Sequence, residues 1–335
     1  MTSTLGIKKI QYPNGTNSIT IDSSGSAAIT TANITTAAIT TANVTNATAT
    51  GTITTPSING GQVGGRRNMM INGAMQVNQR GATSGVTSGY FVDRFRLSGC
   101  SASAVITSNT PTEFPTAITV SATSGNPIVS QRIESNAVQH LSGKTVTASF
   151  LAKNISNATT LYASLAYAGS ADSWGSSTTI SEQNLGTLSG DWVKYTASWT
   201  VPAGGLNGLG LNILCAGSST FTMGVAGVQL EVGSQSTEFE HRSFGEELAL
   251  CQRYFYKHNI NSSSGPRACQ YHNSYKMIHD FFPVTMRAFP TATATFNASF
   301  SSNSLSTNVG KFYVLSSYDA GHNYYMESGQ YDAEL

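Results

Sequence analysis

Between residues 90 and 242, apolar and polar positions alternate along the chain, as they do in β-strands that have one buried and one solvent-facing side. The clearest run is 191–201, where polar side chains occupy every second position. Its apolar face consists of Val193, Tyr195, Ala197, Trp199 and Val201. The same alternation recurs at 161–167 and 209–215. Several such strands, separated by turns rich in Gly, Ser and Asn, predict an antiparallel jelly-roll β-sandwich over 90–242.

One predicted strand changes its apolar parity partway. Along 221–232 the apolar positions are odd-numbered as far as Val225 and even-numbered from Val228 onward, with Gly227 at the change. One extra residue moves the following side chains to the other face of a strand, and glycine tolerates the backbone that this requires. The pattern therefore predicts a β-bulge at Gly227.

One helix is well signalled after the predicted sandwich. The segment 243–246 reads S-F-G-E and matches the S-x-x-E capping box, in which the two side chains satisfy free main-chain N–H groups. We therefore expect a short amphipathic helix at 244–257, so that 243–257 is a helical connector. Alternation returns in the aromatic-rich remainder, which predicts a C-terminal β-domain at 258–335.

The first 65 residues differ in composition from the rest. No aromatic residue occurs between Tyr12 and Tyr90, and no charged residue occurs between Asp22 and Arg66. Within this window, apolar residues recur every five positions in a Thr-rich repeat, with one slip, at Ile29, Ile34, Ile39, Val44, Ile53 and Ile58. One aliphatic residue in five buries too little surface to offset the entropy of ordering a single chain.

Three interpretations of this repeat are open. Three chains can wind together so that each aliphatic residue meets its two copies on a shared axis, which is the interpretation we favour. A single-chain square β-helix is the second, because the segment 32–36 is similar to a pentapeptide-repeat unit, but it would form only about two coils with open ends. A disordered Thr-rich linker is the third. We expect an attachment segment and trimeric β-stalk at 1–65, followed by a connector at 66–89.

The charge and the cysteine content of the chain limit the classes of partner and cofactor that we expect. Charged residues make up 10% of the chain and the net charge is +1, with no basic stripe, so nucleic acid is not an expected partner. No apolar run approaches the roughly 18 residues of a membrane span, and no secretory signal is recognisable, so we expect no membrane insertion. The four cysteines lack metal-ligand spacing. We therefore expect buried free thiols and neither a metal nor a cofactor.

The sequence contains no established catalytic motif. The G-x-S-x-G, H-E-x-x-H, Walker and G-x-G-x-x-G patterns do not occur. Asp172 with Glu182, and Glu238 with Glu240, are near pairs of carboxylates. A glycosidase needs two carboxylates that face each other across a cleft, which spacing in the sequence does not establish. We therefore expect a protein that is not an enzyme.

Three groups of residues form recognisable motifs, namely Arg67–Gly81 with Asp93–Phe95, Val228–Ser234 with Thr237–Glu240 and Glu246–Phe255, and Ile10–Gly25. Together they resemble the tail-fibre proteins of tailed bacteriophages. The resemblance implies a homotrimeric virion fibre, assembled in the host bacterial cytoplasm, whose jelly-roll body is similar to carbohydrate-binding modules. It implies attachment of the N-terminus to another phage structural protein and contact of the C-terminal domains with a host-surface glycan or receptor. The alternatives are a fibre-borne polysaccharide depolymerase and a head-decoration protein without a receptor role.

Two arginines within these stretches have a structural explanation. A guanidinium group presents several N–H donors in a plane and can bind a carboxylate through two of them. We therefore expect Arg80 and Arg94 each to clamp a carboxylate, inside one subunit or between subunits, and not to bind a ligand.

Candidate glycan-binding residues follow from the way proteins hold sugars. Aromatic rings stack on the C–H faces of a sugar, while amides and hydroxyls supply hydrogen bonds. Trp174 stands in a Gly- and Ser-rich segment, where we expect a loop that leaves the indole free. A second set lies in the C-terminal domain: Tyr271, His272, Tyr275, His322, Tyr324 and Tyr325. The alternative is that these rings pack at subunit interfaces. Trp199 is not a candidate, because it lies on the apolar face of its strand and is expected to pack in the core.

Overall fold

A computed structural model describes residues 9–11, 17–21, 27–28, 66–81, 86–107, 110–259, 269–272, 275–296, 300–315 and 326–335. The chain forms two compact units, Met1–Thr54 and Thr55–Leu335. In the first unit, β1 (Lys9–Gln11), β2 (Asn17–Ile21) and β3 (Ala27–Ala28) form an antiparallel sheet in that order. Six residues were expected on the trimer axis, and all of them lie outside the described residues: Ile29, Ile34, Ile39, Val44, Ile53 and Ile58. The trimeric stalk therefore stays a prediction.

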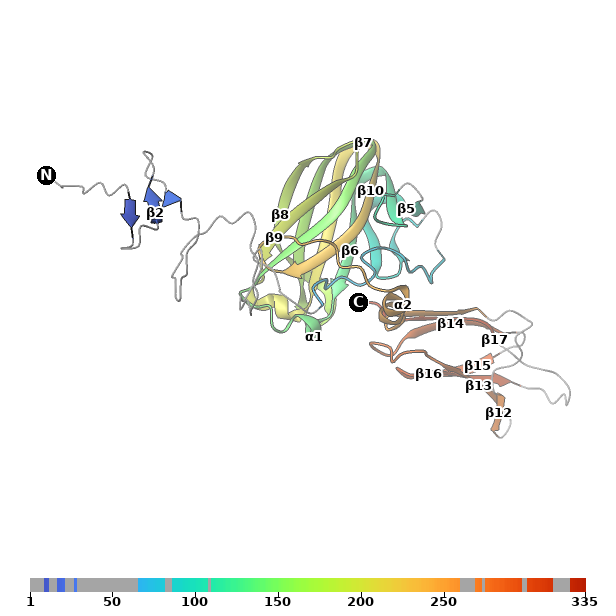
Figure 1. Ribbon diagram of the computed structural model, residues 1–335. Coiled ribbons are helices and arrows are strands. Elements are labelled where there is room, and N and C mark those ends of the chain that lie inside the picture. Colours follow the sequence, from blue (N-terminus) through green and yellow to red (C-terminus); the bar gives the residue numbers. More distant parts are fainter. Residues whose placement is uncertain are drawn as a thin grey trace. The chain divides into compact units, whose positions relative to one another are not determined.

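The largest part of the second unit is an antiparallel sheet of seven strands that curls around its own core, and we call it the body (Figure 1). Its strands are β4 (Gly89–Val92), β5 (Phe95–Thr107), β6 (Ala117–Ile133), β7 (Thr145–Ser170), β8 (Ser173–Thr187), β9 (Val193–Thr200) and β10 (Leu209–Val232). They are joined in the order β4-β5-β6-β10-β7-β8, and β9 also pairs with β7. The helix α1 (Ser135–Val138) and a 3-10 turn (Ala203–Asn207) connect strands.

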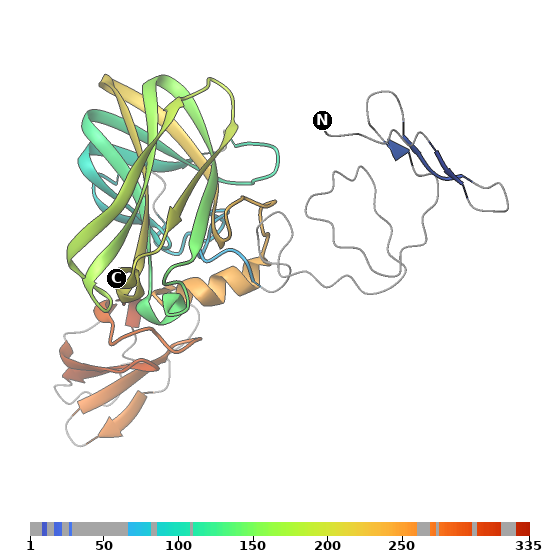
Figure 2. The ribbon, with the colours of Figure 1, turned by 90° about the vertical axis from the view of Figure 1, so that its left-hand side faces the viewer.

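The long strands bend over the core (Figures 1 and 2). β7 has 26 residues, and a straight strand of that length would extend roughly 85 Å at about 3.3 Å per residue. Val146 near its start and Leu165 near its end nevertheless belong to one buried core cluster. Burial along β7 is interrupted at the exposed stretch 155–157, and β6 has a similar exposed stretch at 123–126. The predicted mainly β fold with an antiparallel β-sandwich is confirmed.

The alternation predicted at 191–201 is confirmed for most of its length. Ala197 and Trp199 on β9, and Val201 just beyond it, are buried in the core. Val193, at the start of the strand, is instead 39% exposed. The first apolar residue of the run therefore lies outside the core.

The predicted β-bulge at Gly227 is also confirmed. The register of β10 against β7 shifts between Ala226 and Gln229. Gly227 has a φ of +58°, a backbone conformation that residues with a side chain rarely adopt. The bulge therefore explains why the apolar positions change from odd to even numbers along this strand.

Residues 66–81, expected in a connector, are part of the fold of the body. Met70 lies in the main core cluster. Asn68 fastens the segment to β10, because its Nδ2 donates to the oxygen of Val228 at 3.2 Å and its Oδ1 accepts from the N–H of Leu230 at 3.1 Å. One of the fibre-like stretches thus has a structural role.

The predicted helix is present but shorter than expected. α2 comprises Phe244–Gln252, and the strand β11 (Phe255–Asn259) follows it. The predicted cap is confirmed, since the Oγ of Ser243 accepts a hydrogen bond from the N–H of Glu246 at 3.3 Å. The expected helix end at residue 257 is wrong, because β11 pairs with β17 (Met326–Asp332). Pairing with a distant strand outweighs the local helical pattern there.

Two antiparallel sheets form the C-terminal domain. One joins β11, β17 and β14 (Thr291–Phe296), and the other joins β12 (Cys269–His272), β13 (Tyr275–Phe281), β16 (Val309–Leu315) and β15 (Phe300–Leu305) in that order. Its buried cluster contains Phe282, Met286, Met326, Tyr331 and Ala333. Throughout the described ranges, no helix is both long and apolar enough to cross a membrane.

Candidate functional site

The sequence suggested that Trp174 lies in a free loop, but the structure places it in a strand. It is the second residue of β8 and is half-buried. Its ring lies against Gly210, where an added Cβ would come within 2.9 Å of the indole. The guanidinium carbon of Arg132 lies 4.9 Å from the ring centroid. The indole therefore packs on the sheet, and its role as a glycan contact stays an untested prediction.

The C-terminal candidate residues are only partly described. Tyr271 and His272 lie in β12, and Tyr275 lies in β13, where His272 and Tyr275 are direct cross-strand partners. The backbone therefore brings these three residues together in one hairpin. His322, Tyr324 and Tyr325 lie outside the described residues. Glycan binding by this set stays a prediction.

Arg80 and Arg94 each pair with a carboxylate of the same chain, as expected, but neither holds one carboxylate through two N–H groups. Arg80 donates to Asp332 and to Glu334, at 3.1 Å in both cases. Arg94 is buried and forms an ion pair with Glu334. Both contacts are within one chain and join the body to the last residues of the C-terminal domain. These arginines are therefore structural.

In each near pair of carboxylates, one member accepts hydrogen bonds from the main chain. Asp172 accepts a hydrogen bond of 2.7 Å from the N–H of the first residue of α1, whereas Glu182 lines a surface hollow. Glu240 accepts hydrogen bonds from the N–H groups of residues 67 and 68. Burial raises the pKa of Glu240, but these hydrogen bonds outweigh it and the pKa is lower than usual. One member of each pair is thus committed to the fold.

A hollow of about 220 Å³ lies on the outer face of the body sheet, and we call it the polar hollow. Its lining comes from β6, β7, β8 and β10 and consists of Asn126, Tyr162, Glu182, Leu214, Cys215 and Ala216. Tyr162 and Leu214 are cross-strand partners. Their neighbours Leu161 and Ile213 are buried in the core, so Tyr162 and Leu214 face outward. Tyr162 is half-buried and its ring borders the hollow.

The polar groups around this hollow are available to a ligand. The side chains of Asn126, Tyr162 and Glu182 make no hydrogen bond or ion pair with any residue in the described part of the chain. Burial raises the pKa of Cys215 to about 11, so its thiol is neutral near pH 7 and is not a thiolate nucleophile. In the described ranges, no three His, Cys, Asp or Glu side chains form a group that could hold a metal ion.

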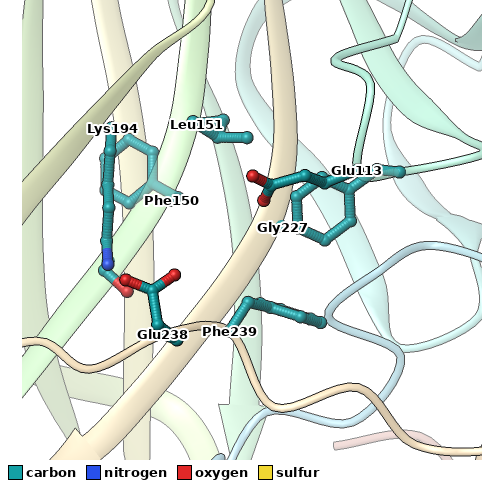
Figure 3. Close-up of a pocket in the computed structure, with 9 residues that line it drawn as sticks. Glu113, Phe150, Leu151, Lys194, Gly227, Glu238 and Phe239 are labelled. Atoms are coloured by element: carbon teal, nitrogen blue, oxygen red, sulfur yellow. The ribbon is translucent and has the colours of Figure 1, made fainter.

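A second hollow of about 40 Å³ lies elsewhere on the body, and we call it the apolar hollow (Figure 3). It is lined by Glu113, Phe114, Ser149, Phe150, Leu151, Lys194, Gly227, Glu238 and Phe239. The rings of Phe114 and Phe239 meet edge to face, with centroids 4.9 Å apart. At ~13 Å³ per water-sized group, this volume holds about three non-hydrogen atoms. It is too small for a sugar ring to lie between the two carboxylates.

A buried hydrogen-bond network holds one wall of the apolar hollow. The carboxylate of Glu231 is buried and accepts from the N–H and the Oγ1 of Thr237, both at 2.7 Å. The Nζ of Lys194 donates to the main-chain oxygen of Thr237 at 2.8 Å. Because Glu238 and Phe239 follow directly in the chain, this network fixes their positions. Glu231 belongs to a fibre-like stretch, so that motif also has a structural role.

The sequence contained a signal for one of the missed residues. Tyr162 is the aromatic residue on the polar parity of the alternating run 161–167, and an aromatic residue there is an exposed ring on a sheet surface. Glu182 was considered only as a partner of Asp172. Phe239 offered no signal, because its place in the apolar hollow depends on the fold of the loop after β10.

Comparisons with known proteins give only weak similarities. No protein-family model matches the sequence, and none of the curated proteins matches it. Among solved structures, the enzymatically active domain of bacteriophage CBA120 tailspike protein 4 has a TM-score of 0.35 at 18% identity, over 49% of this chain and 21% of that one. The C-terminal family 22 carbohydrate-binding module of Clostridium thermocellum Xyn10B has a TM-score of 0.33 at 16% identity, over 43% of this chain and 89% of that one. The module TmCBM61, solved with β-1,4-galactotriose, has a TM-score of 0.32 at 12% identity, over 50% of this chain and 99% of that one. Similarities at this level do not identify a family or a function.

Proposed function

We propose that this chain binds saccharides at the polar hollow of its body. The supporting observation is the convergence of an outward-facing ring, Tyr162, with an amide, Asn126, and a carboxylate, Glu182, none of which has a partner among the described residues. A sugar presents C–H faces that stack on an aromatic ring and hydroxyl groups that bond to amides and carboxylates. The volume of about 220 Å³ suits about one sugar ring, with the rest of a chain in solvent.

The chemistry of the polar hollow favours binding over cleavage. Hydrolysis of a glycosidic bond uses two carboxylates on either side of the bond. Glu182 is the one carboxylate in the described lining. The apolar hollow has two carboxylates, Glu113 and Glu238, but it has no room for a sugar ring. The proposal is therefore a carbohydrate-binding protein and not a depolymerase.

Saccharide binding would serve attachment of a virus to its host. The stretches that resemble phage tail-fibre proteins support this setting, and the proposal includes a homotrimeric virion fibre that is anchored by its N-terminal segment. In that setting the partner is a glycan on the bacterial surface, and a second phage structural protein holds the N-terminus. The polar hollow adds a binding position on the body to the C-terminal residues that the sequence indicated.

Binding is tested first on an array of bacterial surface oligosaccharides and then by calorimetric titration of the strongest hit. We expect Tyr162→Ala to weaken binding about tenfold or more, and Tyr162→Phe to retain most of it, because stacking needs the ring and not the hydroxyl. Glu182→Gln should also weaken binding, whereas Asp191→Asn, which removes an exposed carboxylate that lines neither hollow, should not. Affinity that is unchanged in both Tyr162→Ala and Glu182→Gln, with folding intact, would overturn this site.

A further inference from the structure

We propose that the apolar hollow is a second ligand site, which binds the acetamido group of an N-acetylated sugar. The hollow is distinct from the polar hollow, since the two share no lining residue. Its volume of about 40 Å³ holds about three non-hydrogen atoms. The acetyl part of an acetamido group is of that size. The sugar ring that carries it would remain outside the hollow.

The floor of the hollow suits a methyl group. Phe114, Leu151 and Phe239 supply aromatic and aliphatic surface, and Gly227 leaves the floor open because it has no side chain. Phe114 lies so close to Gly227 that an added Cβ would collide with its ring. Covering one methyl group with such surface is only weakly favourable, so the methyl group contributes specificity more than affinity.

The rim of the hollow suits the polar half of the same group. Figure 3 shows the carboxylates of Glu113 and Glu238 and the amino group of Lys194 around one space. The amino group of Lys194 donates one hydrogen bond to the main-chain oxygen of Thr237 and has further N–H groups that can donate to a ligand. An acetamido group has one N–H donor, which a carboxylate can accept, and one carbonyl acceptor, to which Lys194 can donate.

Charge and shape argue against the other small ligands. An anion would be repelled by Glu113 and Glu238, whereas an ammonium group would be attracted by them but offers no acceptor to Lys194 and no methyl group to the apolar floor. A neutral group with both a donor and an acceptor matches a rim that carries both signs of charge. The wall that bears Glu238 is held in advance by the bonds of Thr237 to Glu231, so little ordering is needed on binding.

The test is saturation-transfer NMR and titration of the full chain with three methyl glycosides of one hexose. The first carries an acetamido group at one ring carbon, the second carries the free amine there, and the third carries a hydroxyl group. We expect saturation of the acetyl methyl protons and, in the Tyr162→Ala variant that lacks binding at the polar hollow, tighter binding of the first glycoside than of the other two. Lys194→Met and Phe239→Ala should each weaken this binding about tenfold. Glu113→Gln is a third variant, at an exposed side chain, which tests the rim without altering the packing of Phe239.

Tyr162→Ala separates the two sites. It should leave the acetyl methyl signal unchanged, even though it removes binding at the polar hollow, so either site can fail alone. The inference is overturned if the acetyl methyl group receives no saturation. It is also overturned if the amine or the parent hexose binds to the Tyr162→Ala variant as well as the acetamido sugar does, or if Tyr162→Ala abolishes the acetyl methyl signal while Phe239→Ala and Lys194→Met retain it.

Discussion

Arg94 and Glu334 form an ion pair from which solvent is excluded, although 240 residues separate them in the sequence. Their side chains are 1% and 3% exposed. The guanidinium carbon of Arg94 also lies 3.5 Å from the ring centroid of Tyr254, and Arg80 donates to the same carboxylate. This cluster joins the turn between β4 and β5 to the residues after β17. The C-terminal domain is thus tied to the body by buried charges.

Glu334→Gln should destabilise the fold by about 3–5 kcal/mol, because it leaves the buried charge of Arg94 without a counter-charge. Urea unfolding measures the change. Asp332→Asn is the matched control, since Asp332 bonds to Arg80 but is 42% exposed, and it should cost less than about 1 kcal/mol. Equal effects of the two substitutions would contradict the role assigned to this cluster.

Asp93 should make stability depend on pH in an unusual direction. Burial raises the pKa of Asp93 from 3.8 to about 6, in spite of two hydrogen bonds from Gln79. The folded protein therefore holds this proton more tightly than the unfolded chain does. Its contribution to the free energy of unfolding is largest below pH 4 and falls by about 3 kcal/mol as the pH rises through 6.

The variant Asp93→Asn isolates this effect, because it carries no charge at any pH. The free energy of unfolding of the variant minus that of the native protein should rise by roughly 2 kcal/mol between pH 4 and pH 7. Denaturant titrations of both proteins at several pH values give this difference, in which the contributions of the other carboxylates cancel. A difference that does not vary with pH would show that Asp93 titrates as an exposed carboxyl group does.

Gly227→Ala should cost about 2–4 kcal/mol of stability. The substitution places a side chain at a φ of +58° and against the ring of Phe114, so strain and overpacking add. It should also displace Phe114 and lower the affinity of the apolar hollow for any ligand. Gly175→Ala on β8 is the control, because an added Cβ there meets nothing within 4 Å, and it should change the unfolding midpoint little. A neutral Gly227→Ala would show that the bulge can relax.

Trp174→Ala distinguishes packing from ligand binding at this residue. The indole covers Gly210 and lies beside Arg132, so we expect the substitution to lower stability by about 1–3 kcal/mol and to leave saccharide binding at the polar hollow intact. Thermal unfolding and the glycan titration measure the two effects. A variant with the native melting temperature and no saccharide binding would instead support the glycan contact that the sequence suggested.

Features set by neighbouring residues were predictable from the sequence. The buried face of β9, the bulge at Gly227 and the cap at Ser243 each depend on periodicity or on local hydrogen bonding. The end of α2 was not predictable in the same way. The helical spacing continues to Phe255, but that residue pairs with Asp332, which comes much later in the chain.

The candidate sites were less predictable than the fold, because they depend on contacts across strands. Nothing near Trp174 in the sequence shows that it packs on Gly210, two strands away in the sheet. The polar hollow brings Asn126, Tyr162 and Glu182 together from three strands. Only the outward parity of Tyr162 was visible in advance. A surface hollow depends on register, and register depends on pairings that the sequence does not state.

The assembly state remains to be tested, and the N-terminal repeat supports a definite prediction. Its apolar positions lie outside the described residues, so the argument rests on the sequence: single aliphatic residues five apart bury enough surface only if several chains share an axis. Light scattering of the full chain should give three times the chain mass of 35.2 kDa. The double variant Ile34→Asp with Ile39→Asp should dissociate the trimer, because each substitution brings three carboxylates together at the axis. Thr36→Asp adds one charge per chain off the axis and should leave the trimer intact. A monomer at micromolar concentration, or equal dissociation by the control, would contradict the shared axis and with it the fibre.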